Sequence, residues 1–179
     1  DKEYDVELVG CSIYPQGYSA VIDRLKDFTG TNIIADIGNG TMNVMYLVNK
    51  KPNDALCWTE KLGVNKCSRR IKNTIMDLYG VELTDSIVEE FLKRGDVDIS
   101  EKYLKIFRET ASQYSEKVFE ALKNYGYKSE LMKLYIIGGG GNVVGRFGKY
   151  DKNRVYINHD ICAAAKGYET LAYLQPKKR

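Results

Sequence analysis

The sequence predicts an α/β fold with one mixed five-stranded sheet and helices on both of its faces. Between Asn32 and Thr59, three apolar runs are separated by short polar turns, which is typical of antiparallel neighbours. From Met132 onward, two apolar runs are each followed by a helical pattern, which is typical of two parallel β-α units. A long helical stretch separates the two groups, so we expect a helical subdomain inserted into the fold.

Composition excludes several classes of protein. The chain has 179 residues, of which 44% are hydrophobic, and 27 Lys and Arg balance 24 Asp and Glu. These charges are spread evenly apart from the basic end at 176–179, so we expect no direct nucleic-acid binding. No apolar run approaches the roughly 18 residues of a membrane span, so we expect no membrane contact. Four cysteines without C-x-x-C spacing indicate reduced thiols in the cytoplasm, and a single histidine, His159, gives a Ser-His-Asp hydrolase little support.

The N-terminal part is expected to contain one strand and one helix. Residues 6–14 have the composition of a strand, which ends at Pro15. Apolar residues from Tyr18 to Phe28 then follow the spacing of an amphipathic helix, and Gly30 ends it.

The three antiparallel strands are expected at 32–35, 42–48 and about 55–59. The links between them are short, and "NKKPND" is the expected turn between the second and third strands. These strands should therefore pair as a meander.

The inserted segment is expected to hold three helices. The first runs from Gly63 to Gly80, and a short second helix starts after Thr84 and stops at Gly95. The longest helix follows, and Asp98 with Glu101 three residues later resembles a capping box at its start. Its apolar stripe is interpreted as core packing only; the stripe comprises Leu104, Phe107, Ala111, Tyr114, Val118, Leu122 and Tyr125.

The last third of the chain alternates strands and helices. We expect strands at 132–137 and 154–158, a helix through Val143 and Phe147, and a closing helix from Asp160 to about Tyr173. One face of the closing helix has very small side chains at 163–167, which indicates either close approach at a hinge or plain packing.

The turn "DIGNGT", residues 36–41, is the first candidate site. Gly38 and Gly40 let consecutive N–H groups face one point, and such a nest binds phosphate oxygens. Asp36 can accept a hydrogen bond from a water bound to Mg²⁺, and Thr41 adds a hydroxyl group. The alternative is an ordinary hairpin turn, because Asn39-Gly40 also favours one.

The second candidate is "IIGGGGNVVGRF", where Gly138 to Gly141 lie between a buried strand and a helix. Four glycines place backbone against something flat or anionic, and the helix N-terminus adds a positive dipole. The alternative is a flexible turn, for which two glycines would suffice.

The third candidate is "YPQGYSA", in which Gln16 follows the first expected strand. A glutamine at a strand end can orient a water for attack on a terminal phosphate. The alternative is a surface turn formed with Pro15 and Gly17.

Taken together and in this order, these motifs resemble the actin-like ATPase superfamily, whose lobes have a ribonuclease H-like fold. Within it, the P-Q pair and the run of glycines are similar to the ParM/StbA group of plasmid-segregation ATPases. The resemblance assigns residues 1–30 to the last strand of a missing first lobe plus a connecting helix. It assigns 31–179 to the second lobe, with the helical insertion at about 64–128.

The resemblance also implies roles for individual residues. Gln16 matches the position that holds the in-line water, and Asp36 would contact Mg²⁺ through water. The matching nucleotide-binding residues are Gly38, Asn39, Gly40 and Thr41 at the phosphate hairpin, Gly138, Gly139, Gly140, Gly141, Asn142 and Val143 at the adenosine motif, and, by a looser alignment, Glu90 and Lys93 near ribose and base.

A two-lobed parent of this kind would bind ATP or GTP with Mg²⁺, polymerise into filaments, and contact an adaptor protein on centromere-like DNA rather than DNA itself. This chain contains only one phosphate hairpin, so we expect it to bind ATP weakly and not to hydrolyse it alone. Two alternatives stay open: a non-polymerising sugar or acyl kinase of the same superfamily, and a structural module that lost catalysis.

Overall fold

The computed structural model describes residues 3–7 and 10–174, so the basic end at 176–179 lies outside the described residues. Five strands form one sheet in the order β3-β2-β1-β4-β5. β1 pairs antiparallel with β2, and β2 with β3, whereas β1–β4 and β4–β5 are parallel. The predicted mixed sheet is therefore confirmed; its strands are β1 (Thr31–Ile37), β2 (Met42–Val48), β3 (Lys51–Glu60), β4 (Lys133–Ile137) and β5 (Val155–Ile157).

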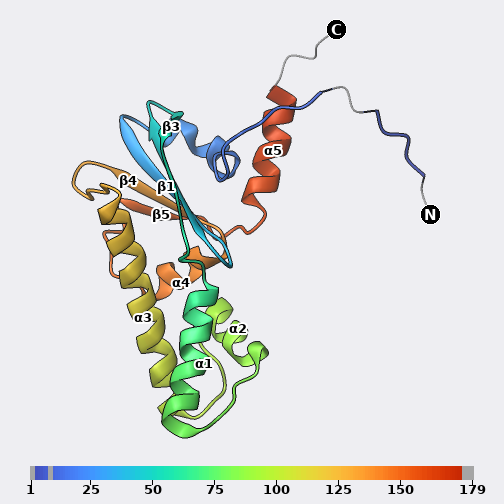
Figure 1. Ribbon diagram of the computed structural model, residues 1–179. Coiled ribbons are helices and arrows are strands. Elements are labelled where there is room, and N and C mark those ends of the chain that lie inside the picture. The colour runs from blue at the N-terminus through green and yellow to red at the C-terminus, as the bar shows by residue number, and fades with distance from the viewer. Residues whose placement is uncertain (1–2, 8–9, 175–179) are drawn as a thin grey trace.

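Helices cover both faces of the sheet, as predicted (Figure 1). Along β1, Ile33 and Ile37 face the larger core, whereas Ile34 faces the smaller one. The helices of the larger core are α1 (Asn65–Tyr79), α2 (Asp85–Arg94), α3 (Glu101–Asn124) and α4 (Gly139–Phe147). The smaller core lies under η1 (Ser19–Asp27), which is a 3₁₀ helix, and α5 (Ala163–Leu174).

The strand expected over 6–14 is not observed. Residues 3–7 and 10–14 form neither helix nor strand, and Leu8 and Val9 lie outside the described residues. The segment runs away from the sheet (Figure 1), so its backbone has no neighbouring strand with which to form a ladder.

The turn between β2 and β3 is shorter than the sequence suggests. Asn49 and Lys50 both have positive φ, at 49° and 72°, which is the backbone of a two-residue hairpin turn. β3 therefore starts at Lys51 and includes Pro52, and the pairing shifts register between Met45 and Leu47. Proline is tolerated because β3 is an edge strand and can leave one side of its backbone unpaired.

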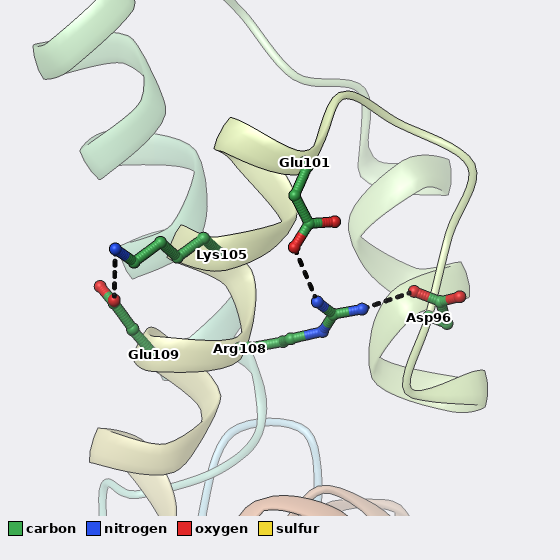
Figure 2. Close-up of polar contacts among 5 residues, drawn as sticks. All are labelled: Asp96, Glu101, Lys105, Arg108 and Glu109. Atoms are coloured by element: carbon green, nitrogen blue, oxygen red, sulfur yellow. Dashed lines mark hydrogen bonds and ion pairs between the residues drawn. The ribbon is translucent and has the colours of Figure 1, made fainter.

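The predicted capping box at the start of α3 is wrong. The N-cap is Ser100, and the Glu101 carboxylate accepts a hydrogen bond from Arg108 at 3.0 Å instead of reaching back to Asp98. Figure 2 shows that Arg108 also contacts Asp96 at 3.3 Å, so this one guanidinium joins the loop after α2 to the first turn of α3. These side chains are largely exposed, so each pair contributes at most about 1 kcal/mol.

The apolar stripe of α3 is core packing, as predicted: from Leu104 to Leu122 its residues are buried. Tyr125, the C-cap residue, is only partly buried and stacks on Trp58 of β3 at 4.8 Å between ring centroids. Its carbonyl accepts a 2.7 Å hydrogen bond from the Tyr46 hydroxyl of β2. These contacts fix the end of α3 against the sheet.

α5 packs directly on η1. A Cβ atom at Gly167 would overlap the Ser19 carbonyl group, so only glycine allows this approach. The small face of the closing helix therefore serves close packing, as the sequence indicates. α5 begins at Ala163 rather than Asp160, because the Asp160 carboxylate accepts a hydrogen bond from the Cys162 N–H and forms a turn there.

Within the described residues, none of the helices combines the length and the apolar character that a membrane crossing requires.

Candidate functional site

Two glycine-rich turns lie side by side at one edge of the sheet. In the parallel pair β1–β4, Asp36 is opposite Ile137, so the turn after β1 and the turn after β4 leave the sheet together. Gly138 is the contact point between them. It has φ of +83°, and a Cβ there would lie 2.6 Å from the Ile37 carbonyl oxygen and 2.8 Å from Asp36 Oδ1.

The hairpin turn is held from one side by the start of α1. The N–H groups of Gly63, Val64 and Asn65 donate hydrogen bonds of 3.2, 3.0 and 2.9 Å to the carbonyl oxygens of Gly40, Gly38 and Asn39, in that order. Val64, the N-cap residue of α1, supplies no side-chain hydrogen bond. The carbonyl groups of the turn therefore satisfy N–H groups that a helix start would otherwise leave unpaired.

These hydrogen bonds orient the other side of the turn. In a trans peptide the C=O and the following N–H point in opposite directions. Because the carbonyls of residues 38–40 face α1, the N–H groups of Asn39, Gly40 and Thr41 face away from it. The turn therefore presents three consecutive amide donors on the side away from α1.

Gly63 is a site residue that the sequence reasoning used only as a helix boundary. A Cβ at Gly63 would overlap the backbone of Asn39 and Gly40. The signal in the sequence is a glycine directly before a helix that lacks a polar N-cap residue. It is a weak signal, because it does not say which backbone segment approaches.

Gln16 and Asp36 meet on the η1 side of the sheet. Gln16 Nε2 donates a hydrogen bond to Asp36 Oδ2 at 3.5 Å. Gly17 has φ of +86°, and a Cβ there would lie 3.4 Å from the Asp36 Cβ, so the turn is packed closely over this carboxyl group. Desolvation by this packing raises the pKa of Asp36 above its ordinary value, and the hydrogen bond from Gln16 opposes the rise only in part.

A cavity of about 280 Å³ adjoins Gln16. Its lining includes Asn43 and Thr59, and the Thr59 hydroxyl donates a 2.8 Å hydrogen bond to Asn43 Oδ1. Asn43 is opposite Asp36 in the β1–β2 pair. Gln16 thus contacts the Asp36 carboxylate and also lines a space large enough for water molecules.

The four glycines after β4 differ in how much space their surroundings leave for a side chain. A Cβ at Gly140 would overlap the Ile37 side chain, and one at Gly141 would lie 3.3 Å from Ile136. A Cβ at Gly139 would meet nothing within 4 Å. Packing therefore explains the other glycines of this turn, but it gives no reason for glycine at position 139.

Asn142, in the first turn of α4, contacts a residue that the sequence reasoning did not include in the site. His159 Nδ1 lies 2.6 Å from Asn142 Oδ1, so the loop after β5 holds this carboxamide. Val143 is buried, and its side chain packs in the larger core.

Glu90 and Lys93 form ion pairs along the exposed side of α2. Glu90 pairs with Arg94 at 2.9 Å, and Lys93 pairs with Glu89 at 3.0 Å. Within the described ranges, no hydrogen bond or ion pair joins either residue to the glycine-rich turns. Their nucleotide contact stays a prediction.

Asp36 belongs to no cluster of metal-ligating side chains among the described residues. The described part of the chain has no group of three or more His, Cys, Asp or Glu residues that could hold a metal ion. A cation here would therefore take most of its ligands from water and from a bound phosphate, which is the usual arrangement for Mg²⁺.

The family assignment rests on the segment that carries this site. Residues 34–147 match the model of the family described as archaeal actin homologue MreB-like, C-terminal, and this match covers more than half of the chain. The chain belongs to this family. The match is to a C-terminal domain, so the chain contains the second lobe of an actin homologue. No curated protein matches the chain.

Solved structures of actin homologues share the fold of this lobe. The archaeal actin homologue Ta0583 superposes with a TM-score of 0.74 at 18% identity over 90% of this chain and 56% of that chain. Its complex with ADP gives 0.69 at 19% identity, over 90% and 57%. ParM from a 15-stranded Clostridium botulinum filament gives 0.74 at 16% identity, over 97% and 56%. The chain thus spans just over half the length of these proteins.

Burial of Asp36 predicts that the free energy of unfolding of this actin-homologue lobe depends on pH. Because the pKa is raised by folding, the unfolded chain ionises first as the pH rises, and the folded state loses stability until the pH passes the raised value. We expect Asp36→Asn to raise the free energy of unfolding in urea at about pH 7, and the gain to shrink towards zero at about pH 3.

The control is Asp77→Asn, which removes an exposed carboxyl group from α1. A gain for Asp36→Asn that is the same at both pH values would contradict the assignment of a desolvated carboxylate.

Proposed function

We propose that this lobe forms one half of the ATP site of a two-lobed, polymerising ATPase. The observation that carries the proposal is the adjacency of the two glycine-rich turns, with the amides of Asn39, Gly40 and Thr41 directed away from α1. These amides are suited to phosphate oxygens. The turn after β4, with Asn142 and Val143, would lie against adenosine.

Gly139 fits this placement. A side chain at this position would clash with nothing in the fold, yet the position is glycine at the open surface of the turn. A flat base lying on the backbone would account for it, because any side chain would occupy that space. The positive end of the α4 dipole lies at the same point.

Gln16 would orient the attacking water. It donates through Nε2 to Asp36, so its Oε1 is the atom that can accept a hydrogen bond from water. Asp36 would contact Mg²⁺ through water, and a cation there would offset the cost of the desolvated carboxylate. Bound ATP supplies the terminal phosphate that the water attacks, with Mg²⁺ neutralising its charge.

The parent protein would use this cycle to assemble and disassemble filaments in the cytoplasm. ParM, one of the structures with this fold, forms filaments. By analogy, we propose self-association of the parent, an adaptor bound to centromere-like DNA as its partner, and a role in plasmid segregation.

The lobe by itself should bind ATP weakly. If both lobes together bind ATP at about 1 μM, worth about 8 kcal/mol, one lobe retains about half of that free energy, or roughly millimolar affinity. Hydrolysis should fail, because the second phosphate clamp and the closure of the lobes are absent.

The 179-residue chain should therefore bind MgATP with a dissociation constant on the order of 1 mM and show no turnover above background. Gly139→Ala should weaken this binding at least about fivefold by placing a methyl group in the adenosine space, while the free energy of unfolding stays equal or rises by up to about 1 kcal/mol. Isothermal titration calorimetry and urea unfolding measure the two effects.

Asn73→Ala, on the exposed side of α1, is the matched control for binding. If Gly139→Ala bound MgATP as tightly as the unmodified chain, adenosine would not lie on this turn.

In a protein that carries both lobes, Gln16→Ala should lower ATP hydrolysis roughly 100-fold, because the water loses its orienting group. Filaments that pellet with ATP should then persist longer, as measured by sedimentation. Gln113→Ala, an exposed glutamine on α3, is the control and should leave both unchanged. A two-lobed protein that hydrolyses ATP normally after Gln16→Ala, or never pellets with ATP, would favour the kinase alternative.

A further inference from the structure

Tyr114 belongs to the buried stripe of α3 and is only 4% exposed, yet its side chain ends in a hydroxyl group. The hydroxyl donates a 3.0 Å hydrogen bond to the Leu62 carbonyl, in the segment that joins β3 to α1. Burial raises the pKa of Tyr114, so the hydroxyl stays protonated and remains a donor. A phenylalanine would fill the same part of the core, so packing alone does not explain the tyrosine.

The Leu62 carbonyl is one end of a peptide unit whose other end holds the hairpin turn. In a trans peptide the C=O and the following N–H point in opposite directions. The Leu62 carbonyl accepts from the Tyr114 hydroxyl. The Gly63 N–H of the same peptide unit donates to the Gly40 carbonyl at 3.2 Å. This peptide unit is therefore fixed at both ends, between α3 and the turn.

The link extends one residue further, to Thr41. The Gly40 carbonyl and the Thr41 N–H also share one trans peptide unit, so this N–H points away from Gly63. A continuous series of hydrogen bonds and peptide units therefore runs from the Tyr114 hydroxyl to the outward amide of Thr41. Hydrogen bonds in series polarise and orient one another, so a change at one end is felt at the other.

The other two outward amides are held by α1 itself, because their peptide units accept from Val64 and Asn65. The Gly63 carbonyl, which shares a peptide unit with the Val64 N–H, accepts from the Lys66 N–H at 3.0 Å. The Val64 carbonyl, which shares one with the Asn65 N–H, accepts from the Cys67 N–H at 3.0 Å. The hydrogen bond from Gly63 is the longest of the three, and its peptide unit is supported from α3 instead of α1.

We propose that Tyr114 is a positioning residue of the hairpin turn: its hydroxyl sets the direction of the Thr41 amide through the Leu62–Gly63 peptide. The inference rests on the proposed function, in which this amide binds a phosphate oxygen. A donor that is already held in its binding orientation loses less conformational freedom when the anion arrives. The packing of α3 and the affinity of the turn are therefore linked, and the link is reciprocal.

Amide hydrogen exchange of the unliganded 179-residue chain tests this link in the absence of nucleotide. Relative to the amides of β1, which report global stability, the Gly63 amide should exchange at least about fivefold faster in Tyr114→Phe than in the unmodified chain. In the same variant, the chemical shift of the Thr41 amide should change more than those of residues 39 and 40, because α1 still holds their peptide units.

The matched control is Tyr46→Phe, which also removes a core hydroxyl that donates to a backbone carbonyl, that of Tyr125. Both variants should lower the melting temperature, by on the order of 5 °C, because each leaves a carbonyl without its donor. In Tyr46→Phe the relative exchange rate of Gly63 and the shift of Thr41 should stay as in the unmodified chain. The control thus separates positioning from a general loss of stability.

MgATP affinity gives the second measurement. Tyr114→Phe should raise the dissociation constant for MgATP about fivefold, and Tyr46→Phe should leave it unchanged. If the unmodified chain does not bind MgATP, the nucleotide site is wrong, and the exchange comparison still decides whether Tyr114 directs the Thr41 amide.

Four results would overturn the proposal. They are equal relative exchange of Gly63 in the two variants, equal shifts at residues 39, 40 and 41 in Tyr114→Phe, equal MgATP affinity in the two variants, and loss of the dispersed amide spectrum of the folded chain in Tyr114→Phe. The last result would mean that the hydroxyl serves folding rather than positioning.

Discussion

The candidate site depends on three hydrogen bonds between the start of α1 and the turn after β1. The first N–H groups of the helix and the carbonyl groups of the turn satisfy one another, so neither needs a side-chain cap. The same contact turns the amides of Asn39, Gly40 and Thr41 outward, and it requires glycine at position 63. One backbone contact thus anchors the inserted helices to the sheet and orients the amides that are proposed to bind phosphate.

The second feature of the candidate site is the buried carboxyl group of Asp36, whose ionised form is unfavourable. Asp36 is desolvated by the turn that carries Gln16 and Gly17, and within this lobe its strongest compensation is one long hydrogen bond. A carboxylate held in this way is poised to interact with a cation or with water bound to one. The proposed nucleotide and Mg²⁺ would offset this cost, and perturbed carboxyl groups are common at functional sites.

Local patterns predicted much of this molecule. The strand runs and β-α units predicted the antiparallel meander and the parallel strands, and the spacing from Leu104 to Leu122 predicted the buried face of α3. The glycine-rich turns and Gln16 were found because turn chemistry is local. The actin-like fold followed from their order and is confirmed by the family match.

Contacts between distant segments were not predictable. The link from α1 to the hairpin turn joins residues far apart in sequence and uses only backbone atoms, so no side chain signals it. The capping box at Glu101 failed because Arg108, seven residues further along α3, donates a hydrogen bond to the same carboxylate. Residues 3–7 and 10–14 form no strand, because no strand of this sheet lies beside them; that 6–14 is the last strand of a first lobe stays a prediction.

The outward amides of the hairpin turn are proposed to bind the phosphates of ATP. Amide chemical shifts of the isotope-labelled chain during titration with MgATP test this proposal most directly. The largest saturable shifts should occur at Asn39, Gly40 and Thr41, together with residues 139–143. Saturable binding that leaves the amides of residues 39–41 unshifted would contradict it.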